Sequence, residues 1–396
     1  MAADALQTKV PSLLDPYQGD GTTLATLEVA GQELPNITRF SYRSDVLNLG
    51  DPFAVTLANP RGKWTGKLPV GATVKYSLTN KDANGGQKTP KLVGIITHRD
   101  VASDGGSGTV ITLRGADLGW HLLNNSGPCW QPLQGITFQT MLNKVVDSSW
   151  GFAGVRTEND TNRKLKLGRA GAKIQLAPHV TIPLQRIQIE PGESIADVLI
   201  LYAKRLGLLV NVSADGYLQV FTPNYSQPSR YVLNYHDVAE PESVKNNVER
   251  ARLSETCESI YTEVTCVGEV VALPVGQAGD NPNVGKFRGR FENTSALPFL
   301  HRLVFADSEQ LSKTLADFRA TWRYQRGLFD SKTITYLVRG HHQNGVWWES
   351  DTMADVEDSV NGLRGRFYVS AVQCNRDMES GDTTEVTLKM PDLLGA

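Results

Sequence analysis

Several features are scarce or missing in this chain of 396 residues, and each absence excludes a class of protein. The four cysteines contain no Cys-x-x-Cys pair, which argues against a disulfide scaffold and against a structural zinc cluster. No apolar run approaches the roughly 18 to 20 residues that a membrane-spanning helix needs. The first residues lack the basic and apolar regions of a secretory signal. We therefore expect a protein that stays in the cytosol or leaves it by a route other than a signal peptide.

The charge balance and the missing motifs exclude further functions. Forty Lys and Arg residues face 42 Asp and Glu residues, for a net charge of −2, whereas nucleic-acid-binding domains are usually clearly basic. The sequence contains no Gly-x-Ser-x-Gly motif, no Walker-type loop and no His-Glu-x-x-His motif. We therefore predict no catalytic residues, no cofactor site and no metal site.

Most of the chain alternates apolar and polar residues with a period of two, which is typical of strands with one buried face. Segments 23–29, 53–57 and 73–78 show this pattern, and turn-forming clusters such as Gly50-Asp51-Pro52 separate them. Asp215-Gly216 and Asn344-Gly345 each stand between two apolar runs, which predicts two tight hairpins. The expected fold is mainly β with α+β parts: two tube-like antiparallel β-barrel domains plus a mid-chain α/β unit.

Three segments have helical rather than strand periodicity. The first follows Thr137, the second has Ser194 as its N-cap and Gly207 as its stop, and the third runs from Ser308 to about Arg326, with Gly327 as its stop. The length of the chain predicts two to four domains. We expect an N-terminal tail at 1–20, a first barrel at 21–118, a middle α+β region at 119–235, and a second barrel at 236–396 with an insertion at about 268–300.

The two ends of the chain resemble each other. A strand ending in Arg99-Asp100, a polar turn and a second strand are echoed by a strand ending in Arg376-Asp377, a polar turn and a second strand. Segments 70–78 and 352–360 hold corresponding places before the two hairpins. The pattern favours a duplicated β module, although any two hairpins share some features. Two such modules in each of three chains would form six similar units around one axis.

The order of these features resembles that of the baseplate hub proteins of contractile-tailed bacteriophages, the Mu-type and T4-type hubs related to the base of type VI secretion spikes. The matching segments include Tyr42-Arg43-Ser44-Asp45, Leu68-Pro69-Val70-Gly71, Glu190-Pro191-Gly192-Glu193-Ser194 and Gly365-Arg366-Phe367-Tyr368-Val369. The resemblance covers most of residues 20–394, except the segment at about 268–300.

The resemblance implies a structural role and a set of partners. A homotrimer with pseudo-sixfold symmetry would join the sixfold tail tube to the threefold central spike and would form part of the channel for DNA ejection. Its partners would be other copies of itself, the tail spike protein, the tail tube protein or tube initiator and other baseplate proteins, with phage DNA passing through without specific binding. The implied location is the baseplate of the virion, assembled in the bacterial cytoplasm.

Two sets of basic residues are candidate contact sites. The polar face of the third helix carries Arg319, Arg323 and Arg326, which we expect at a subunit interface, unless this face is only solvated. A basic cluster would contact the channel or the spike, or would be a mobile surface loop. Its residues are Arg163, Lys164, Lys166, Arg169 and Lys173.

Two other hypotheses remain open from the sequence. His341-His342 beside Glu349 and Asp351 raises the question of a metal site, but adjacent residues of a strand point to opposite faces. The alternative function is a tail-associated carbohydrate-active or host-binding β protein. Tryptophans that stack on sugars and a pair of catalytic carboxylates would serve such a protein, but tryptophans in strands are more often core or interface residues, and the separation of two carboxylates cannot be read from the sequence.

Overall fold

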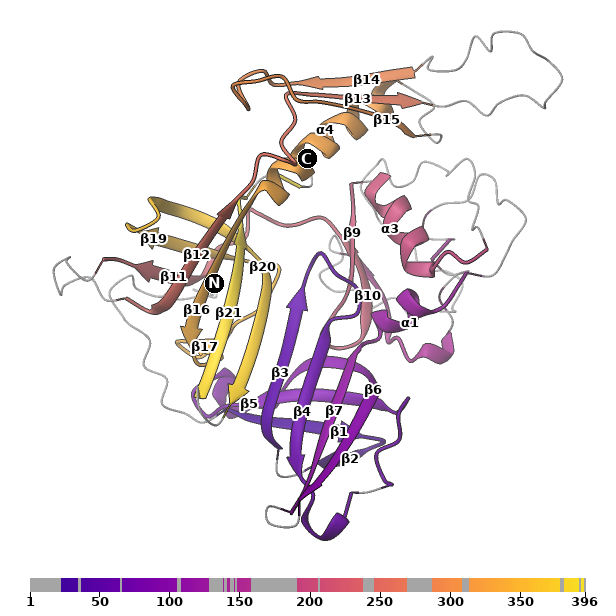
Figure 1. Cartoon of the computed structure of the whole chain (residues 1–396), viewed down its shortest axis with the longest axis vertical. Coiled ribbons are helices and arrows are strands. Elements are labelled where there is room, and N and C mark those ends of the chain that lie inside the picture. Colours follow the sequence, from indigo (N-terminus) through magenta and orange to yellow (C-terminus); the bar gives the residue numbers. More distant parts are fainter. Residues whose placement is uncertain are drawn as a thin grey trace, which may run out of the picture.

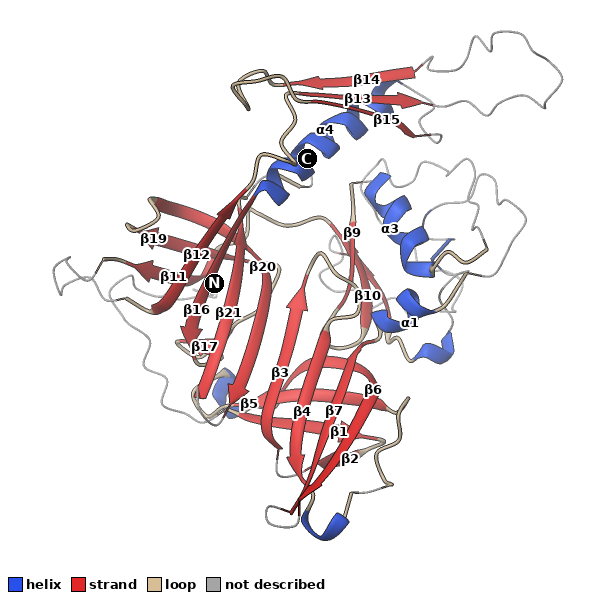
Figure 2. Ribbon diagram, in the orientation of Figure 1, coloured by secondary structure: helices blue, strands red, loops and turns tan. Residues whose placement is uncertain are grey.

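The computed structural model describes residues 23–34, 37–64, 66–104, 108–127, 138, 141–142, 146, 148–157, 191–205, 207–237, 246–268, 287–307, 313–377, 381–391 and 393–394. The fold is mainly β with α+β parts, as predicted, and is dominated by a 13-stranded sheet (Figures 1 and 2). Among the described residues, no helix combines the length and the apolar character needed to cross a membrane.

The large sheet consists of two modules with the same strand order. The first module contains β1 (Leu24–Val29), β3 (Ile37–Asp45), β4 (Pro52–Ala58), β5 (Thr73–Thr79), β6 (Thr89–Asp104) and β7 (Gly108–Asp117), with the short β2 (Gln32–Leu34) on its edge. The second contains β11 (Ser229–Tyr235), β12 (Val248–Glu255), β16 (Lys332–Arg339), β19 (Thr352–Asp358), β20 (Leu363–Asp377) and β21 (Gly381–Lys389). The orders β3-β4-β7-β6-β5-β1 and β12-β16-β21-β20-β19-β11 match strand for strand, both in space and along the chain.

The β-bulges of the two modules also lie at equivalent positions. Thr97 is the extra residue of a β-bulge between β6 and β7, and Ser370 is the extra residue of the bulge between β20 and β21. Thr38 and Glu249 occupy the corresponding bulges on β3 and β12. Because a bulge fixes the local register and bend of a strand, these paired irregularities identify equivalent positions in the two modules.

The strand register corrects the predicted alignment of the repeat. Asp104 pairs with Gly108 and Asp377 pairs with Gly381, so Asp377 corresponds to Asp104. The sequence echo had matched Asp377 with Asp100, four residues earlier. One strand also differs in direction, because β11 runs parallel to β19 whereas β1 runs antiparallel to β5. By its pairing, β11 belongs to the sheet of the second module, although the boundary predicted at 235 groups it with the middle region.

A helical and β unit follows the first module. It contains α1 (Gly119–Asn124), β8 (Gly154–Thr157), α3 (Ile195–Arg205), β9 (Leu209–Val212) and β10 (Tyr217–Phe221), with a 3₁₀ turn at Ser148–Trp150. The predicted hairpin at Asp215-Gly216 joins β9 to β10, with Gly216 in the left-handed conformation. Ser194 caps α3 by accepting a hydrogen bond from the Asp197 amide at 3.0 Å, and Gly207 follows the helix with a φ of 70°, both as predicted.

An insertion between β12 and β16 forms a separate layer at one end of the molecule (Figure 1). It contains β13 (Glu263–Gly268), β14 (Phe287–Glu292), β15 (Arg302–Asp307) and α4 (Lys313–Ser331), so it extends beyond the predicted 268–300. Gly289 lies directly under the backbone of Ala316, which lets β14 pack closely on α4. In the second module, β17 (His342–Gln343) and β18 (Val346–Trp347) flank the predicted turn at Asn344-Gly345.

Gly327 does not end α4, as the sequence had suggested, but lies inside it. The helix continues to Ser331. A Cβ atom at Gly327 would collide with the carbonyl oxygen of Ser259, whose hydroxyl donates a hydrogen bond of 2.9 Å to the Gly327 carbonyl. A glycine is therefore needed here because the loop before β13 approaches the helix closely, and not because the helix ends in a left-handed residue.

Candidate functional site: the seam between the two modules

The two modules join through an antiparallel pairing of β3 with β20. The register runs from Ala371 opposite Asp45 to Arg376 opposite Phe40, and the Val46 amide extends it by donating to the Ser370 carbonyl at 3.0 Å. The inward side chains of this seam belong to one apolar core that spans both modules, including Phe40, Tyr42, Val372 and Cys374. The seam therefore makes the two modules one continuous sheet.

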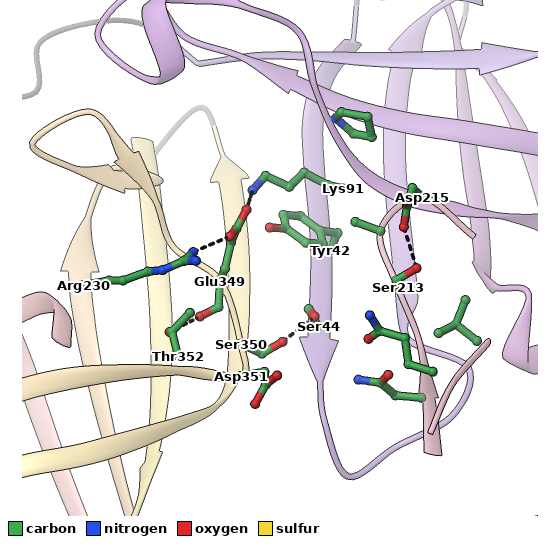
Figure 3. A pocket seen from close by; sticks show the side chains of 15 residues that line it. Tyr42, Ser44, Lys91, Ser213, Asp215, Arg230, Glu349, Ser350, Asp351 and Thr352 are labelled. Carbon is green, nitrogen blue, oxygen red and sulfur yellow. Dashed lines mark hydrogen bonds and ion pairs between the residues drawn. The ribbon is translucent and has the colours of Figure 1, made fainter. Parts of the chain in front are cut away.

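A polar cavity of about 500 Å³ lies beside the seam, between the two modules and the β9–β10 hairpin (Figure 3). Glu349 lies between two cations: its Oε1 is 3.0 Å from Lys91 Nζ and its Oε2 is 3.1 Å from Arg230 NH1. The side chain of Lys91 is only 3% exposed. Because Lys91 is buried, losing Glu349 would leave its charge uncompensated, so this contact holds β6 of the first module against the second module.

Hydroxyl groups complete the polar contacts around the cavity. Ser44 Oγ and Ser350 Oγ share a hydrogen bond of 2.8 Å across the modules, and Thr352 Oγ1 donates to the Glu349 carbonyl at 2.7 Å. Burial raises the pKa of the Tyr42 phenol well above its usual value, so this hydroxyl stays protonated. The groups seen in Figure 3 thus bind mainly to one another, as expected of a junction between parts of one chain.

Arg319 is not on the outer face of its helix, contrary to the expectation from the sequence. Arg319 is only 8% exposed. Its Nε lies 3.2 Å from Asp307 Oδ2, and Arg205 Nε lies 3.0 Å from Oδ1 of the same carboxylate. Its NH1 also donates to the Lys204 carbonyl at 2.9 Å. Because Arg319 faces α3 and β15 within its own chain, it joins the insertion to the middle unit.

The other predicted contact residues have different outcomes. Arg323 and Arg326 are partly exposed; Arg323 lies over the Tyr261 ring, and Arg326 pairs with Asp330 at 2.7 Å. Their role at a subunit interface stays a prediction. The basic cluster of Arg163, Lys164, Lys166, Arg169 and Lys173 lies outside the described residues.

The two adjacent histidines are both buried in the second module. His341 Nε2 is 3.0 Å from the Asn375 carbonyl oxygen, and its Nδ1 is 3.9 Å from Asp382 Oδ2. The His342 ring meets the Trp347 ring edge-on, at 5.9 Å between centroids. Burial lowers the pKa of both imidazoles. Across the part of the chain that the structure describes, no group of three or more His, Cys, Asp or Glu side chains is placed to hold a metal ion.

Sequence reasoning missed a cluster of three buried carboxylates at the start of the seam. Asp45, Asp51 and Asp117 are 5%, 6% and 3% exposed. They lie at the end of β3, in the turn before β4 and at the end of β7, so no local spacing links all three. Only the position of Asp51 in the predicted turn Gly50-Asp51-Pro52 was a signal.

Comparisons with known proteins find the same fold in phage tail proteins. No family model matches the chain, and no curated protein matches it by sequence. A tail protein from Neisseria meningitidis MC58 superposes with a TM-score of 0.71 and 19% identity, over 94% of this chain and 98% of that one. The 43 kDa tail protein of prophage MuSo2 from Shewanella oneidensis gives 0.69 and 19%, over 94% and 100%.

A secretion protein shares the fold more distantly. This E. coli component of the type VI secretion system, described as structurally similar to the T4 tail proteins gp27 and gp5, superposes with a TM-score of 0.54 and 11% identity, over 93% of this chain and 78% of that one. The chain therefore has the fold of these phage tail proteins, and the resemblance predicted from the sequence is confirmed at the level of the fold.

Proposed function

We propose that the protein is the structural hub of a contractile phage tail baseplate, not an enzyme. It assembles as a homotrimer with pseudo-sixfold symmetry, joins the sixfold tail tube to the threefold spike, and forms part of the channel through which DNA leaves the virion. The observation that carries the proposal is the duplication: two modules share strand order and bulge positions, and one already pairs with the other inside the chain.

The proposed closure of three chains into a ring is based on the seam within the chain. Inside the chain, β20 uses its edge from Ala371 to Arg376 to pair with β3. The equivalent edge of the first module is β6 from His98 to Ser103, and the equivalent of β3 is β12. No strand of the described chain pairs with either of these edges. In a ring, β6 of one copy therefore pairs with β12 of the next.

The equivalent positions also give the register of this contact. Cys374 faces Tyr42 in the seam, and the bulges relate Cys374 to Val101 and Tyr42 to Leu253. Val101 is 42% exposed and Leu253 is partly buried, so their contact would remove apolar surface from water. Two positions further, the same register places Arg99 of one copy opposite Glu255 of the next, which adds an attraction between opposite charges.

The outward face of the sheet, over β4, β7, β16 and β21, suits a channel for a polyanion. It carries small hydroxyl side chains, among them Thr56, Thr112, Thr335 and Thr387, and its charges include the Arg39–Asp377 pair at 3.4 Å. The hydroxyls carry no charge and would bind phosphates weakly, whereas the exposed Arg114 and Arg252 on the same face would attract passing DNA without reading its sequence. Tail spike, tail tube or tube initiator and other baseplate proteins are the proposed partners at the two ends of the ring.

Mass photometry of the purified protein and of one edge variant tests the proposal. Wild-type protein should form a particle of three 43.4 kDa chains under assembly conditions. Val101→Lys should weaken this trimer at least about tenfold, because a charge would be buried at the contact. Val360→Lys is the matched control, since Val360 is 52% exposed in the turn between β19 and β20 and belongs to neither edge, and it should leave the trimer intact. A persistent monomer or dimer in the wild type, or an unaffected Val101→Lys trimer, would contradict the proposed ring.

A further inference from the structure

The turn between β3 and β4 is the point at which three apolar cores of the molecule meet. Val46 packs with Met353, Tyr368 and Phe329 of the second module and α4, whereas Leu49 packs with the core of the middle unit. Phe53, directly after the turn, belongs to the core shared by both modules. The conformation of this turn therefore fixes how the first module sits against the rest of the chain.

Buried carboxylates hold the turn in place. Asp51 accepts a hydrogen bond from the Asp45 amide, at 3.0 Å to Oδ2, and Asp117 Oδ1 accepts from the Gly119 amide at 2.7 Å. Asp117 also accepts from the amides of Gly50 and Asp51. It thereby ties the turn to the end of β7 and to the first residue of α1, where the middle unit begins.

The charges around these carboxylates do not balance. Arg43 NH2 lies 2.7 Å from Asp45 Oδ2, so the positive charge of the guanidinium mainly compensates the charge of Asp45. Lys389 of the second module is a further cation within electrostatic reach of Asp45. Asp51 and Asp117 are therefore two adjacent buried acids with too little positive charge beside them for both to ionise at low cost.

We propose that Asp51 and Asp117 form a proton-binding lock that holds the first module in a fixed orientation relative to the middle unit. With one proton on the pair, the turn stays closed and the amides of Gly50, Asp51 and Gly119 stay bonded to Asp117. When the proton leaves, two adjacent anions repel each other and draw water, and the turn opens. No redox or covalent step is involved, since only a proton is exchanged with solvent.

The titration of the pair gives the direction and the pH range of the effect. Burial, followed by repulsion from Asp117, raises the pKa of Asp51, and burial raises the pKa of Asp117 to about 7. A raised pKa in the closed form means that closure is favoured at low pH and is lost as the pH rises toward 7. Above pH 7 the carboxylates are ionised in both the closed and the open form, and closure no longer depends on pH.

Hydrogen–deuterium exchange of the full chain between pH 5 and 8.5, corrected for intrinsic rates, tests the lock. In wild-type protein the opening constant of peptides 45–52 and 117–122 should rise about tenfold per pH unit between pH 5 and 7 and then level off. Peptide 209–221, in the β9–β10 hairpin, is the internal control and should show no such slope. A wild-type protein without the slope would overturn the proposal by itself.

Two variants separate the lock from general effects of pH. Asp117→Asn keeps an acceptor for the amides but cannot ionise, so it should stay protected at every pH. The exposed Asp100→Asn is the matched control and should keep the wild-type slope. The same slope in Asp117→Asn as in the wild type would assign the opening to other groups.

Discussion

Thr97 and Ser370 occupy the same position in two copies of one β module. Each is the unpaired extra residue of a bulge in the long strand of a hairpin, and from each bulge the two pairings continue in step to Asp104–Gly108 and Asp377–Gly381. A bulge shared at an equivalent position is stronger evidence of duplication than similar hydrophobic patterns, because it is a local exception to regular pairing. The proposed ring depends on this equivalence.

Because Arg319 pairs with Asp307 of its own chain, replacing Arg319 should reduce the stability of the fold rather than the assembly of copies. Arg319→Ala would remove one of the two guanidiniums from a buried carboxylate and should lower the free energy of unfolding by about 3 kcal/mol. Arg323→Ala is the control, since Arg323 is partly exposed, and it should cost less than about 1 kcal/mol. Urea denaturation measures both. If both variants lowered the free energy of unfolding equally, the buried cluster of Arg319, Arg205 and Asp307 would not be what holds the insertion against the middle unit.

Gly327→Ala should lower stability, which is the opposite of the usual effect of replacing glycine by alanine in a helix. In an exposed helix interior, Gly→Ala stabilises by about 1 kcal/mol. Here the added methyl group would collide with the Ser259 carbonyl, so Gly327→Ala should destabilise by about 1 to 3 kcal/mol. Thermal unfolding compares it with Gln325→Ala, a partly exposed neighbour that should change little. Stabilisation by Gly327→Ala would show that the loop before β13 does not contact the helix.

The buried histidines predict acid destabilisation of the second module. The pKa values of His341 and His342 are lowered in the folded protein, so the unfolded chain takes up protons first as the pH falls below about 6.5. Their contribution to stability is present above that pH and is lost on acidification.

Thermal unfolding between pH 4.5 and 7 measures this loss. His342→Gln should flatten the acid slope, whereas Asp117→Asn should steepen it, because protonation of Asp117 acts in the opposite direction. Identical slopes in the wild type and His342→Gln would exclude His342 as a source of the acid sensitivity.

Local features were predictable from the sequence because their causes are local. The Ser194 cap, the left-handed Gly207 and the turns at Asp215-Gly216 and Asn344-Gly345 each depend on a few adjacent residues. The β modules were also predictable, since alternation with a period of two marks a half-buried strand.

Features that depend on long-range packing were not predictable. Arg319 has the spacing of an exposed helix residue, and only the approach of Arg205 and Asp307 from other elements explains its burial. The dipeptides Arg99-Asp100 and Arg376-Asp377 suggested one alignment of the repeat, but the register is set by bulges that leave no clear mark in the sequence. The three acids at the start of the seam meet only because β3, β4 and β7 are neighbours in the sheet.

The most direct test of the ring is a disulfide between copies, made in a Cys257→Ser background. Val101→Cys with Leu253→Cys places the two sulfurs on the same face of the proposed contact, within the reach of a disulfide. Oxidation should convert this double variant into a covalent trimer on a non-reducing gel. Val101→Cys with Arg252→Cys, one residue out of register, and each single variant should stay unlinked. A covalent trimer from the first pair alone would support pairing of β6 with β12, whereas equal cross-linking of both pairs, or none in a protein that forms trimers, would contradict it.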